Sequence, residues 1–240
     1  YSEYIRMMFY GENYTFQKLL SNMIQNSIAK RTIDLTTLDE LATKYGTDKQ
    51  PSEHNYVSNY AKILKNVDVN SMLEIGLGNG ASARMWRDYF PNSKIFCMEF
   101  FGEENKNKWD GADGIIEGID IVSGDSTKEE SWNNIPYGLD FIIDDGSHFP
   151  GDQIKTFALG FSHLKTNGIY VIEDTHCGLE EKYGASTELY QWFINLVLDQ
   201  QSPVANWGGN FYSIRHAIQG MAKDILSFHL YRSMMVFERA

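Results

Sequence analysis

The sequence predicts an α/β fold in which helices cover both faces of a mostly parallel sheet. Three observations support this: short apolar strands alternate with helix-length segments, a glycine-rich turn follows the first of these strands, and two closely spaced strands end the chain. Strands joined through helices pair in parallel, because the crossover returns the chain to the same end of the sheet. The final pair lacks a crossover, so we expect an antiparallel hairpin.

The amino-terminal part of the 240-residue chain differs from the rest. Apolar side chains recur at helical spacing in residues 14–30, and further helices are expected over residues 38–44 and 55–65. We assign residues 1–50 to a helical extension or lid and residues 51–240 to the main domain. The chain opens with Tyr1 rather than methionine. A domain cut from a longer polypeptide therefore stays open, and the helical stretch up to about residue 33 leaves a homo-oligomer open as well.

Seven strands are expected in order along the main domain. The parallel strands are predicted at 72–76, 94–99, 118–122, 139–145 and 168–174, and the hairpin occupies residues 225–238. The intervening helices are predicted at 81–89, 152–164 and 186–198. The unbroken apolar run Phe141-Ile142-Ile143 is typical of a strand buried on both faces. In doubly wound sheets of this kind, ligands bind beyond the carboxyl ends of the strands.

Composition excludes several classes of partner. The chain has 21 Lys and Arg against 32 Asp and Glu, a net charge of −11 that disfavours binding to phosphate backbones. We therefore expect no nucleic-acid partner. An apolar run of membrane-spanning length and a signal peptide are both missing from the sequence, so no membrane partner is expected. Cys97 and Cys177 lack metal-type or disulfide spacing, and we expect reduced thiols in a cytoplasmic protein.

A glycine-rich loop, Gly76-Leu77-Gly78-Asn79-Gly80, follows the first strand and opens a helix. Its Gly-x-Gly-x-Gly spacing departs from the Gly-x-Gly-x-x-Gly pattern of dinucleotide-binding folds. Glu74, just before the loop, suits a cationic cofactor better than a pyrophosphate. We infer that S-adenosylmethionine (SAM) binds here, beside Glu74, Gly76, Gly78 and Gly80.

Two further acids follow the next strands. Glu99 ends the second strand, where an acid can accept the hydroxyls of a ribose. Asp125 follows the third strand, and we expect it beside the adenine. Either residue could instead be an ordinary solvated acid at a strand end. Their order after the glycine loop favours the cofactor interpretation.

Acidic residues are densest where strands four and five end. The segments are Asp144-Asp145-Gly146-Ser147-His148 and Glu173-Asp174-Thr175-His176, and neither contains a lysine or arginine. Neighbouring strands lie about 4.8 Å apart, so these carboxylates repel unless protons or a cation relieve them. We predict that Asp145, Glu173 and Asp174 bind Mg²⁺, with Mn²⁺ or Ca²⁺ as alternatives. Glu173 and Asp174 can both reach the ion only if the strand frays, because consecutive strand residues face opposite sides.

His148 follows Asp145 in the same loop and is the candidate general base. A metal acidifies a coordinated hydroxyl, and a nearby imidazole can then accept its proton. We therefore assign catalysis to His148 and Asp145. His176 is a second candidate base or a substrate contact, and Asp144 is expected to support the cofactor or to orient its neighbours. The alternative for His148 is a loop histidine that is hydrogen-bonded to backbone.

Four segments resemble the metal-dependent sugar O-methyltransferases of macrolide biosynthesis, of the mycinamicin type: residues 73–82, 85–91, 143–148 and 170–175. The resemblance covers residues 40–240 and implies a Rossmann-like class I methyltransferase fold with seven strands. It also implies that Asp145, Glu173 and Asp174 hold Mg²⁺, that His148 is the base and that a vicinal diol of a sugar binds the metal. Residues 45–49 and 54–56 share the similarity and suggest a lid, with His54 and Tyr56 as substrate contacts.

The sequence thus predicts a SAM- and metal-dependent O-methyltransferase that acts on a small polyhydroxylated acceptor, a sugar or a glycosylated natural product. Aromatic residues around Trp192, Trp207 and Tyr212 suit such an acceptor, and residues 201–216 are a candidate acceptor loop. Three alternatives stay open: a metal-dependent C-methyltransferase domain of a natural-product megasynthase, a Rossmann-fold oxidoreductase or hydroxylase-like protein, and a non-catalytic SAM-binding module. The all-carboxylate cluster favours hydroxyl chelation.

Overall fold

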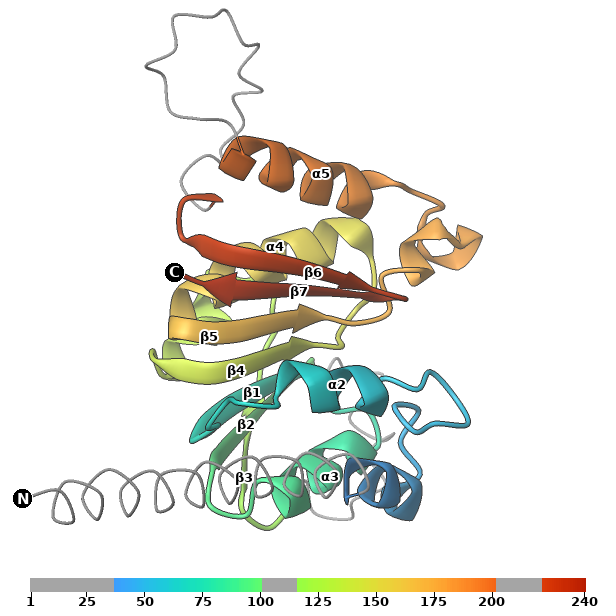
Figure 1. Ribbon diagram of the computed structural model, residues 1–240, viewed down its shortest axis with the longest axis vertical. Helices are drawn as coiled ribbons and strands as arrows, with labels where there is room; N and C mark the ends of the chain where they lie inside the picture. The colour runs from blue at the N-terminus through green and yellow to red at the C-terminus, as the bar shows by residue number, and fades with distance from the viewer. Residues whose placement is uncertain (1–36, 101–115, 202–221) are drawn as a thin grey trace, which may run out of the picture. The chain divides into compact units, whose positions relative to one another are not determined.

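The computed structural model describes residues 37–100, 116–201 and 222–240 (Figure 1). The predicted helix at 14–30 and most of the candidate acceptor loop, with Trp207 and Tyr212, lie outside these residues. Contacts divide the chain into two compact units, Tyr1–Val67 and Asp68–Ala240, and each is described by itself. The predicted limit of the extension at residue 50 falls within the first unit, and its role as a lid stays a prediction.

The described part of the first unit contains two helical segments. Residues 37–45 are helical, and α2 spans Val57–Ile63. Both segments were predicted, and their ends differ from the prediction by no more than a turn. Leu38, Ala42, Val57 and Tyr60 are fully buried. They are the apolar positions that helical periodicity places on one face of each segment.

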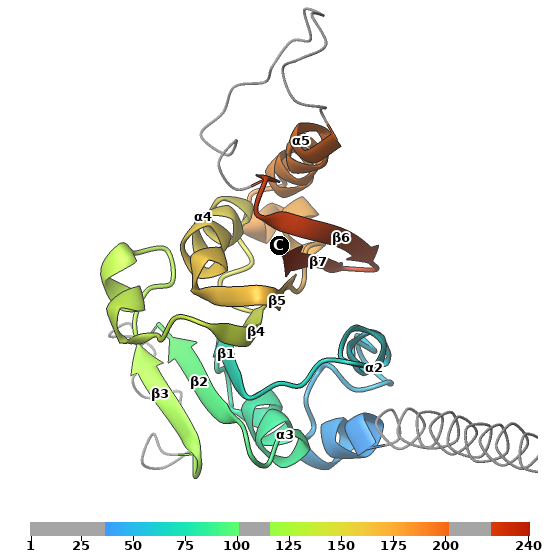
Figure 2. The ribbon, with the colours of Figure 1, turned by 60° about the vertical axis from the view of Figure 1, so that its left-hand side comes forward.

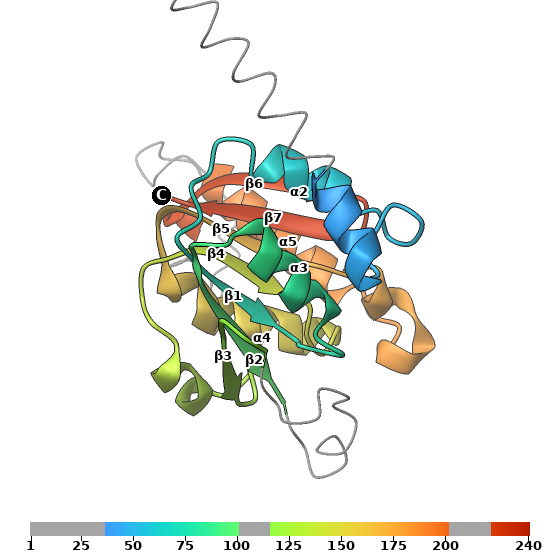
Figure 3. The same ribbon diagram turned by 90° about the horizontal axis from the view of Figure 1, so that it is seen from below.

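The second unit is built on one seven-stranded sheet with the order β3-β2-β1-β4-β5-β7-β6. Its strands are β1 Ser71–Ile75, β2 Lys94–Glu99, β3 Ile119–Ser123, β4 Leu139–Asp144, β5 Leu164–Ile172, β6 Ile225–Tyr231 and β7 Met234–Arg239. The first five strands pair in parallel, whereas β7 is antiparallel to both β5 and β6. The predicted mostly parallel sheet with a carboxyl-terminal hairpin is confirmed. The strand order reverses between β1 and β4 (Figure 3).

Helices cover both faces of this sheet, as predicted (Figure 2). They are α3 Ala81–Tyr89, α4 Pro150–Gly160 and α5 Glu188–Gln201. Trp86 of α3 packs edge-on against Phe141 of β4, with ring centroids 6.0 Å apart. The next residue of β4, Ile142, faces the other way and joins the core beneath α4 and α5 with Phe157 and Trp192. Phe141 and Ile142 therefore point to opposite faces of the sheet. Phe141 packs under α3, and Ile142 packs under α4 and α5.

Several predicted boundaries were wrong. The strand predicted at 168–174 begins at Leu164 and ends at Ile172, because Leu164 pairs with Leu139 before the register shifts. β4 ends at Asp144, one residue early, and β3 starts at Ile119. The helix predicted at 152–164 begins at Pro150, whose fixed backbone suits the first helical turn, and ends at Gly160 before the short 3₁₀ turn η2 (Phe161–His163).

The described residues contain no helix that combines the length and apolar character needed to traverse a lipid bilayer.

Candidate active site

The carboxyl ends of three central strands remain linked beyond the strands themselves. The amide of Asp145 donates to the carbonyl of Ile75 at 2.9 Å, and the amide of Glu173 donates to the carbonyl of Asp144 at 2.9 Å. The loops after β1, β4 and β5 therefore leave the sheet side by side. This is also where the strand order reverses, the position at which open α/β sheets bind ligands.

The glycine loop depends on two glycines for different reasons. Gly76 has φ 90°, and a Cβ added there would lie 2.1 Å from the backbone oxygen of Asp145. Only glycine allows the loops after β1 and β4 to approach so closely. Gly78 has φ 54°, yet a Cβ there would meet nothing within 4 Å. Gly80, with φ 75°, caps α3. The loop thus combines a tight backbone crossing with open space beside Gly78.

The two glutamates near this loop lie at different depths. Glu74 is fully buried in β1, between Cys97 of β2 and Ile143 of β4. Glu99 ends β2, and its Oε2 accepts hydrogen bonds from the amides of Leu77 at 2.6 Å and Gly78 at 3.2 Å. The Glu99 carboxylate therefore holds the glycine loop in place, a role that the sequence did not indicate. Its predicted contact with a ribose stays a prediction.

Asp125 lies in a local turn after β3. Its Oδ1 accepts hydrogen bonds from the amide and hydroxyl of Thr127, at 2.9 Å and 2.6 Å. Burial alone would raise the pKa of Asp125, but these hydrogen bonds, with nearby Lys128 and Lys155, lower it. The side chain is therefore an ionised, fixed acceptor at the end of β3. Its predicted place beside the adenine stays a prediction.

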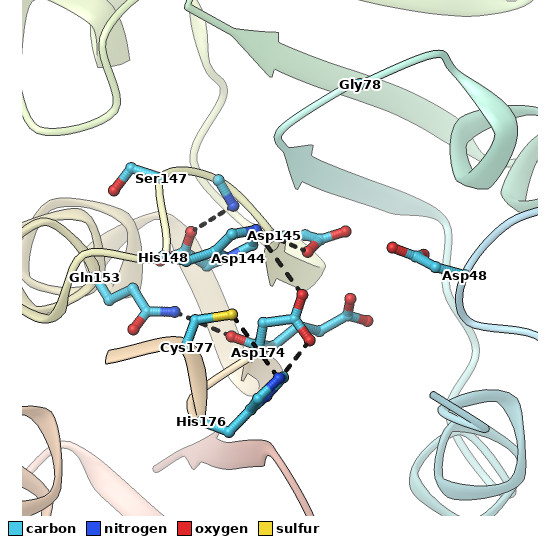
Figure 4. Close-up of polar contacts among 12 residues, drawn as sticks. Asp48, Gly78, Asp144, Asp145, Ser147, His148, Gln153, Asp174, His176 and Cys177 are labelled. Carbon is cyan, nitrogen blue, oxygen red and sulfur yellow. Dashed lines mark hydrogen bonds and ion pairs between the residues drawn. The ribbon is translucent and has the colours of Figure 1, made fainter. Parts of the chain in front are cut away.

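Asp145, His148 and Asp174 form the central group of the site (Figure 4). Nε2 of His148 lies 4.0 Å from Oδ1 of Asp145 and 3.8 Å from Oδ2 of Asp174. One ligand atom of each residue lies within 4.8 Å of those of the other two. His148 and Asp174 have φ 60° and 52°, in the left-handed region that these residue types tolerate better than most. Such conformations concentrate at functional sites, because the surrounding structure must hold them.

The end of β5 satisfies the condition on which the predicted metal site depends. The strand stops at Ile172, so Glu173 and Asp174 both lie beyond it and need not alternate between faces. Glu173 is buried, and its carbonyl accepts a hydrogen bond from Nε2 of Gln153 at 3.0 Å. The structure brings the carboxylates of Asp145 and Asp174 together, whereas Glu173 is not part of their 4.8 Å group. Its role as a ligand stays a prediction.

Asp144 differs from its neighbour because it is almost completely buried. Burial raises the pKa of Asp144 to about 8, and the charges of Asp145 and Asp152 add to the effect, although the Gly146 amide opposes it. The hydroxyl of Tyr170 faces the same carboxyl, and its own pKa is raised well above the usual value by burial and by Asp144. Asp144 is therefore a buried support below the site, and its predicted contact with the cofactor is untested.

Three residues around the site were not predicted to take part. Tyr183 presents its ring edge-on to His148, with centroids 5.9 Å apart. Gln153 of α4 donates a hydrogen bond to the backbone carbonyl of Glu173. Sγ of Cys177 lies 3.9 Å from Nε2 of His176. None of the three carries a sequence signal, because their positions depend on the loop after β5 and on the packing of α4.

The remaining predicted contacts divide between the two units. Nδ1 of His176 lies 4.0 Å from Oδ1 of Asp174, so His176 belongs to the edge of the site. His54 and Tyr56 stack on one another in the first unit, with centroids 5.2 Å apart and planes 18° apart. Their role in substrate binding stays a prediction.

The donor chemistry of the central group fits a hard divalent cation. Two carboxylates that face one another repel, and a cation between them removes the repulsion while accepting their oxygen atoms. The adjoining imidazole of His148 is a softer donor and is better suited to proton transfer than to Mg²⁺. The open, positive-φ loop around Gly78 suits a cofactor that approaches the backbone closely.

No protein family model matches the chain. A curated relative, the L-olivosyl-oleandolide 3-O-methyltransferase of Streptomyces antibioticus, is 33% identical over 156 residues, 61% of this chain and 39% of the relative. The mycinamicin VI 2''-O-methyltransferase of Micromonospora griseorubida is 30% identical over 149 residues, 57% of this chain and 35% of the relative. The chain therefore spans well under half the length of these two relatives.

Two solved structures of MycE, a methyltransferase of the mycinamicin biosynthetic pathway, share this fold. The complex of MycE with Mg and S-adenosylhomocysteine (SAH) has a TM-score of 0.65 and 26% identity, over 85% of this chain and 54% of that one. The complex that also holds mycinamicin VI has a TM-score of 0.66 and 25% identity, with the same coverage. The Rossmann-like methyltransferase fold and the resemblance to macrolide sugar O-methyltransferases, both predicted from the sequence, are confirmed.

Proposed function

We propose that this chain is an O-methyltransferase that transfers the methyl group of SAM to a hydroxyl of a small glycosylated acceptor, with the help of a divalent cation. One observation carries the proposal: the carboxylates of Asp145 and Asp174 converge on Nε2 of His148, beside the glycine loop. We assign a cation site, a base and a cofactor loop to this edge of the sheet.

For cofactor binding we propose the residues predicted from the sequence. SAM would supply an electrophilic methyl group and a positive charge. The crossing of Gly76 with Asp145, the open space at Gly78 and the αL cap at Gly80 shape the backbone that receives it. Glu99 fixes this loop through the Leu77 and Gly78 amides. Glu74, Asp125 and Asp144 complete the predicted set.

The chain's own chemistry is to orient the acceptor and remove its proton. Asp145, Glu173 and Asp174 would hold Mg²⁺, or Mn²⁺, which lowers the pKa of a coordinated hydroxyl. Nε2 of His148 receives that proton, and the nearby carboxylates of Asp145 and Asp174 stabilise the imidazolium that results. The Tyr183 ring packs at a right angle to the His148 ring and lines one side of it. Positioning then supplies much of the remaining rate enhancement.

The acceptor class rests on the relatives and on charge. The curated relatives are named for methylation of olivosyl, mycinamicin and rhamnosyl substrates, and each is an O-methyltransferase. A net charge of −11 supports a small neutral acceptor rather than nucleic acid. These observations favour hydroxyl methylation over the C-methyltransferase and oxidoreductase alternatives.

The test is methyl transfer from isotopically labelled SAM to macrolides that carry an olivosyl or rhamnosyl sugar, with and without Mg²⁺. We expect labelled O-methyl product that disappears when the metal is chelated and returns when Mg²⁺ is restored. Calorimetry with SAH, in the presence and absence of Mg²⁺, measures cofactor binding without turnover. A chain that fails to bind SAH would contradict the proposal, as would transfer that is unaffected by chelation.

A further inference from the structure

The turn that follows Asp174 holds a second group of metal-binding side chains. Ligand atoms of His176, Cys177 and Glu180 all lie within 4.8 Å of one another. Cys177 is buried, His176 is partly exposed and Glu180 is exposed. The group contains an imidazole, a thiol and a carboxylate, so its chemistry differs from that of the Asp145 and Asp174 pair.

The backbone of this turn brings the three residues together. The 3₁₀ turn η3 spans Cys177–Leu179, and the amide of Glu180 donates to the carbonyl of Cys177 at 2.9 Å. Side chains three positions apart are eclipsed in a 3₁₀ turn, so Glu180 lies over Cys177. The amide of Leu179 donates to the carbonyl of His176 at 3.0 Å and places that residue in the same turn.

The separation of two of these ligand atoms is close to that around a tetrahedral ion. Nε2 of His176 and Sγ of Cys177 are 3.9 Å apart. Zinc–nitrogen and zinc–sulfur bonds of about 2.0 and 2.3 Å, at a tetrahedral angle, separate the two ligand atoms by about 3.5 Å. A small side-chain rotation closes the difference. Thiolate and imidazole ligands select Zn²⁺ over Mg²⁺, which prefers oxygen.

Asp174 adds an independent feature of a metal-binding histidine. The other ring nitrogen of His176, Nδ1, lies 4.0 Å from Oδ1 of Asp174. A dashed line joins the two residues in Figure 4. Histidines that bind metals commonly direct their second nitrogen at a carboxylate, which fixes the ring and its tautomer. The imidazole thus lies between Asp174 on one side and Cys177 on the other.

We propose that His176 Nε2, Cys177 Sγ and the Glu180 carboxylate form a binding site for Zn²⁺, separate from the Mg²⁺ site, in which Asp174 orients the His176 ring. Solvent or a substrate group completes the tetrahedron. When the ion binds, the Cys177 thiol releases its proton to solvent and a metal–sulfur bond forms, with no change in oxidation state. This site does not depend on SAM or on an acceptor.

Co²⁺ is a suitable probe, because a cobalt–thiolate bond gives a charge-transfer absorption band that oxygen and nitrogen ligands do not give. The full chain is titrated with Co²⁺ in the presence of excess Mg²⁺, and Zn²⁺ is then added. We expect one thiolate band that saturates at one equivalent, that Mg²⁺ does not suppress and that Zn²⁺ removes.

Variants separate the proposed ligands from their neighbours. Cys177→Ser should abolish the band, whereas Cys97→Ser, at the other thiol, should keep it. Glu180→Gln should weaken Co²⁺ binding at least ~10-fold, the size expected for loss of a supporting metal contact, and Glu181→Gln in the adjoining turn η4 (Glu181–Tyr183) should not. Circular dichroism confirms folding of the serine variants, and Glu180 is exposed, so its substitution leaves the fold intact. A missing band, a band retained in Cys177→Ser or binding unchanged by Glu180→Gln would overturn the site.

Discussion

Nε2 of His148 lies 3.8 Å from Oδ2 of Asp174, although the two residues follow different strands. Both have positive φ in loops that leave β4 and β5 side by side. The proposed base and a proposed metal ligand are therefore held by the same pair of strand ends. Substitution of His148 should lower the rate of proton transfer, whereas substitution of Asp174 should weaken metal binding. The two roles can therefore be measured separately.

Removal of the imidazole should stop chemistry but spare binding. His148→Ala should lower kcat by ~10²–10⁴-fold, the usual contribution of a general base, because no other group then accepts the hydroxyl proton at that position. SAH affinity, measured by calorimetry, should stay within about twofold of wild type, since His148 is not among the proposed cofactor residues. His229→Ala, at an exposed position of β6, is the matched control and should keep full activity. Full activity in His148→Ala would show that another group is the general base.

Gly76 should be much less tolerant of a methyl group than an exposed turn glycine. Gly76→Ala places Cβ against the backbone oxygen of Asp145, and we expect a loss of at least ~3 kcal/mol in the free energy of unfolding. Gly184→Ala is the control, because Gly184 has φ 98° but its added Cβ meets nothing within 4 Å. That substitution should cost only the backbone strain, ~1–2 kcal/mol. Urea denaturation measures both, and equal losses would show that the loop crossing is not rigid.

Acid sensitivity should depend on Asp140, which ties β4 to the start of β1. Its Oδ2 accepts from the amides of Asn70 at 2.9 Å and Ser71 at 2.8 Å, and Lys165 pairs with Oδ1. Burial alone would raise the pKa of Asp140, but Lys165 and the two amides lower it below its usual value. Because the folded pKa is depressed, this stabilisation is present above the unfolded pKa of about 3.9 and is lost as pH falls through the folded pKa.

Asp140→Asn should therefore cost ~1–3 kcal/mol at neutral pH, the value of hydrogen bonds to a charged group. Its stability should also fall less steeply than that of wild type as the pH drops from about 5 towards 3. Thermal unfolding across this range measures the effect, and Asp120→Asn, at an exposed position of β3, is the control. Parallel pH profiles for wild type and Asp140→Asn would contradict the assignment.

The features that the sequence predicted are those with short-range signals. The apolar run of β4 predicts a buried strand, and the spacing of Gly76, Gly78 and Gly80 predicts a turn that leads into a helix. Both signals are local and do not depend on residues elsewhere in the chain. The convergence of Asp145 and Asp174 followed from a simple rule, because adjacent parallel strands end at the same edge. The start of β5 was missed, because residues 165–167 are polar and exposed and gave no strand pattern.

Other features depend on packing that no local pattern encodes. Glu99, at the end of β2, accepts from the Leu77 and Gly78 amides, which lie in the loop after β1. The raised pKa of Asp144 reflects complete burial together with charges from Asp145 and Asp152. The group of His176, Cys177 and Glu180 has no recognisable spacing, because a 3₁₀ turn rather than a metal-binding motif brings it together.

The central claim is that carboxylates at the tips of β4 and β5 bind a divalent cation beside His148. Calorimetric titration of Mg²⁺ into the SAH-saturated chain, compared with Asp145→Asn and Asp174→Asn, tests it most directly. We predict one Mg²⁺ per chain, with at least ~10-fold weaker binding in each variant and unchanged affinity in Asp120→Asn, whose exposed carboxylate belongs to β3. Equal Mg²⁺ binding in wild type and both site variants, or no binding at all, would contradict the account.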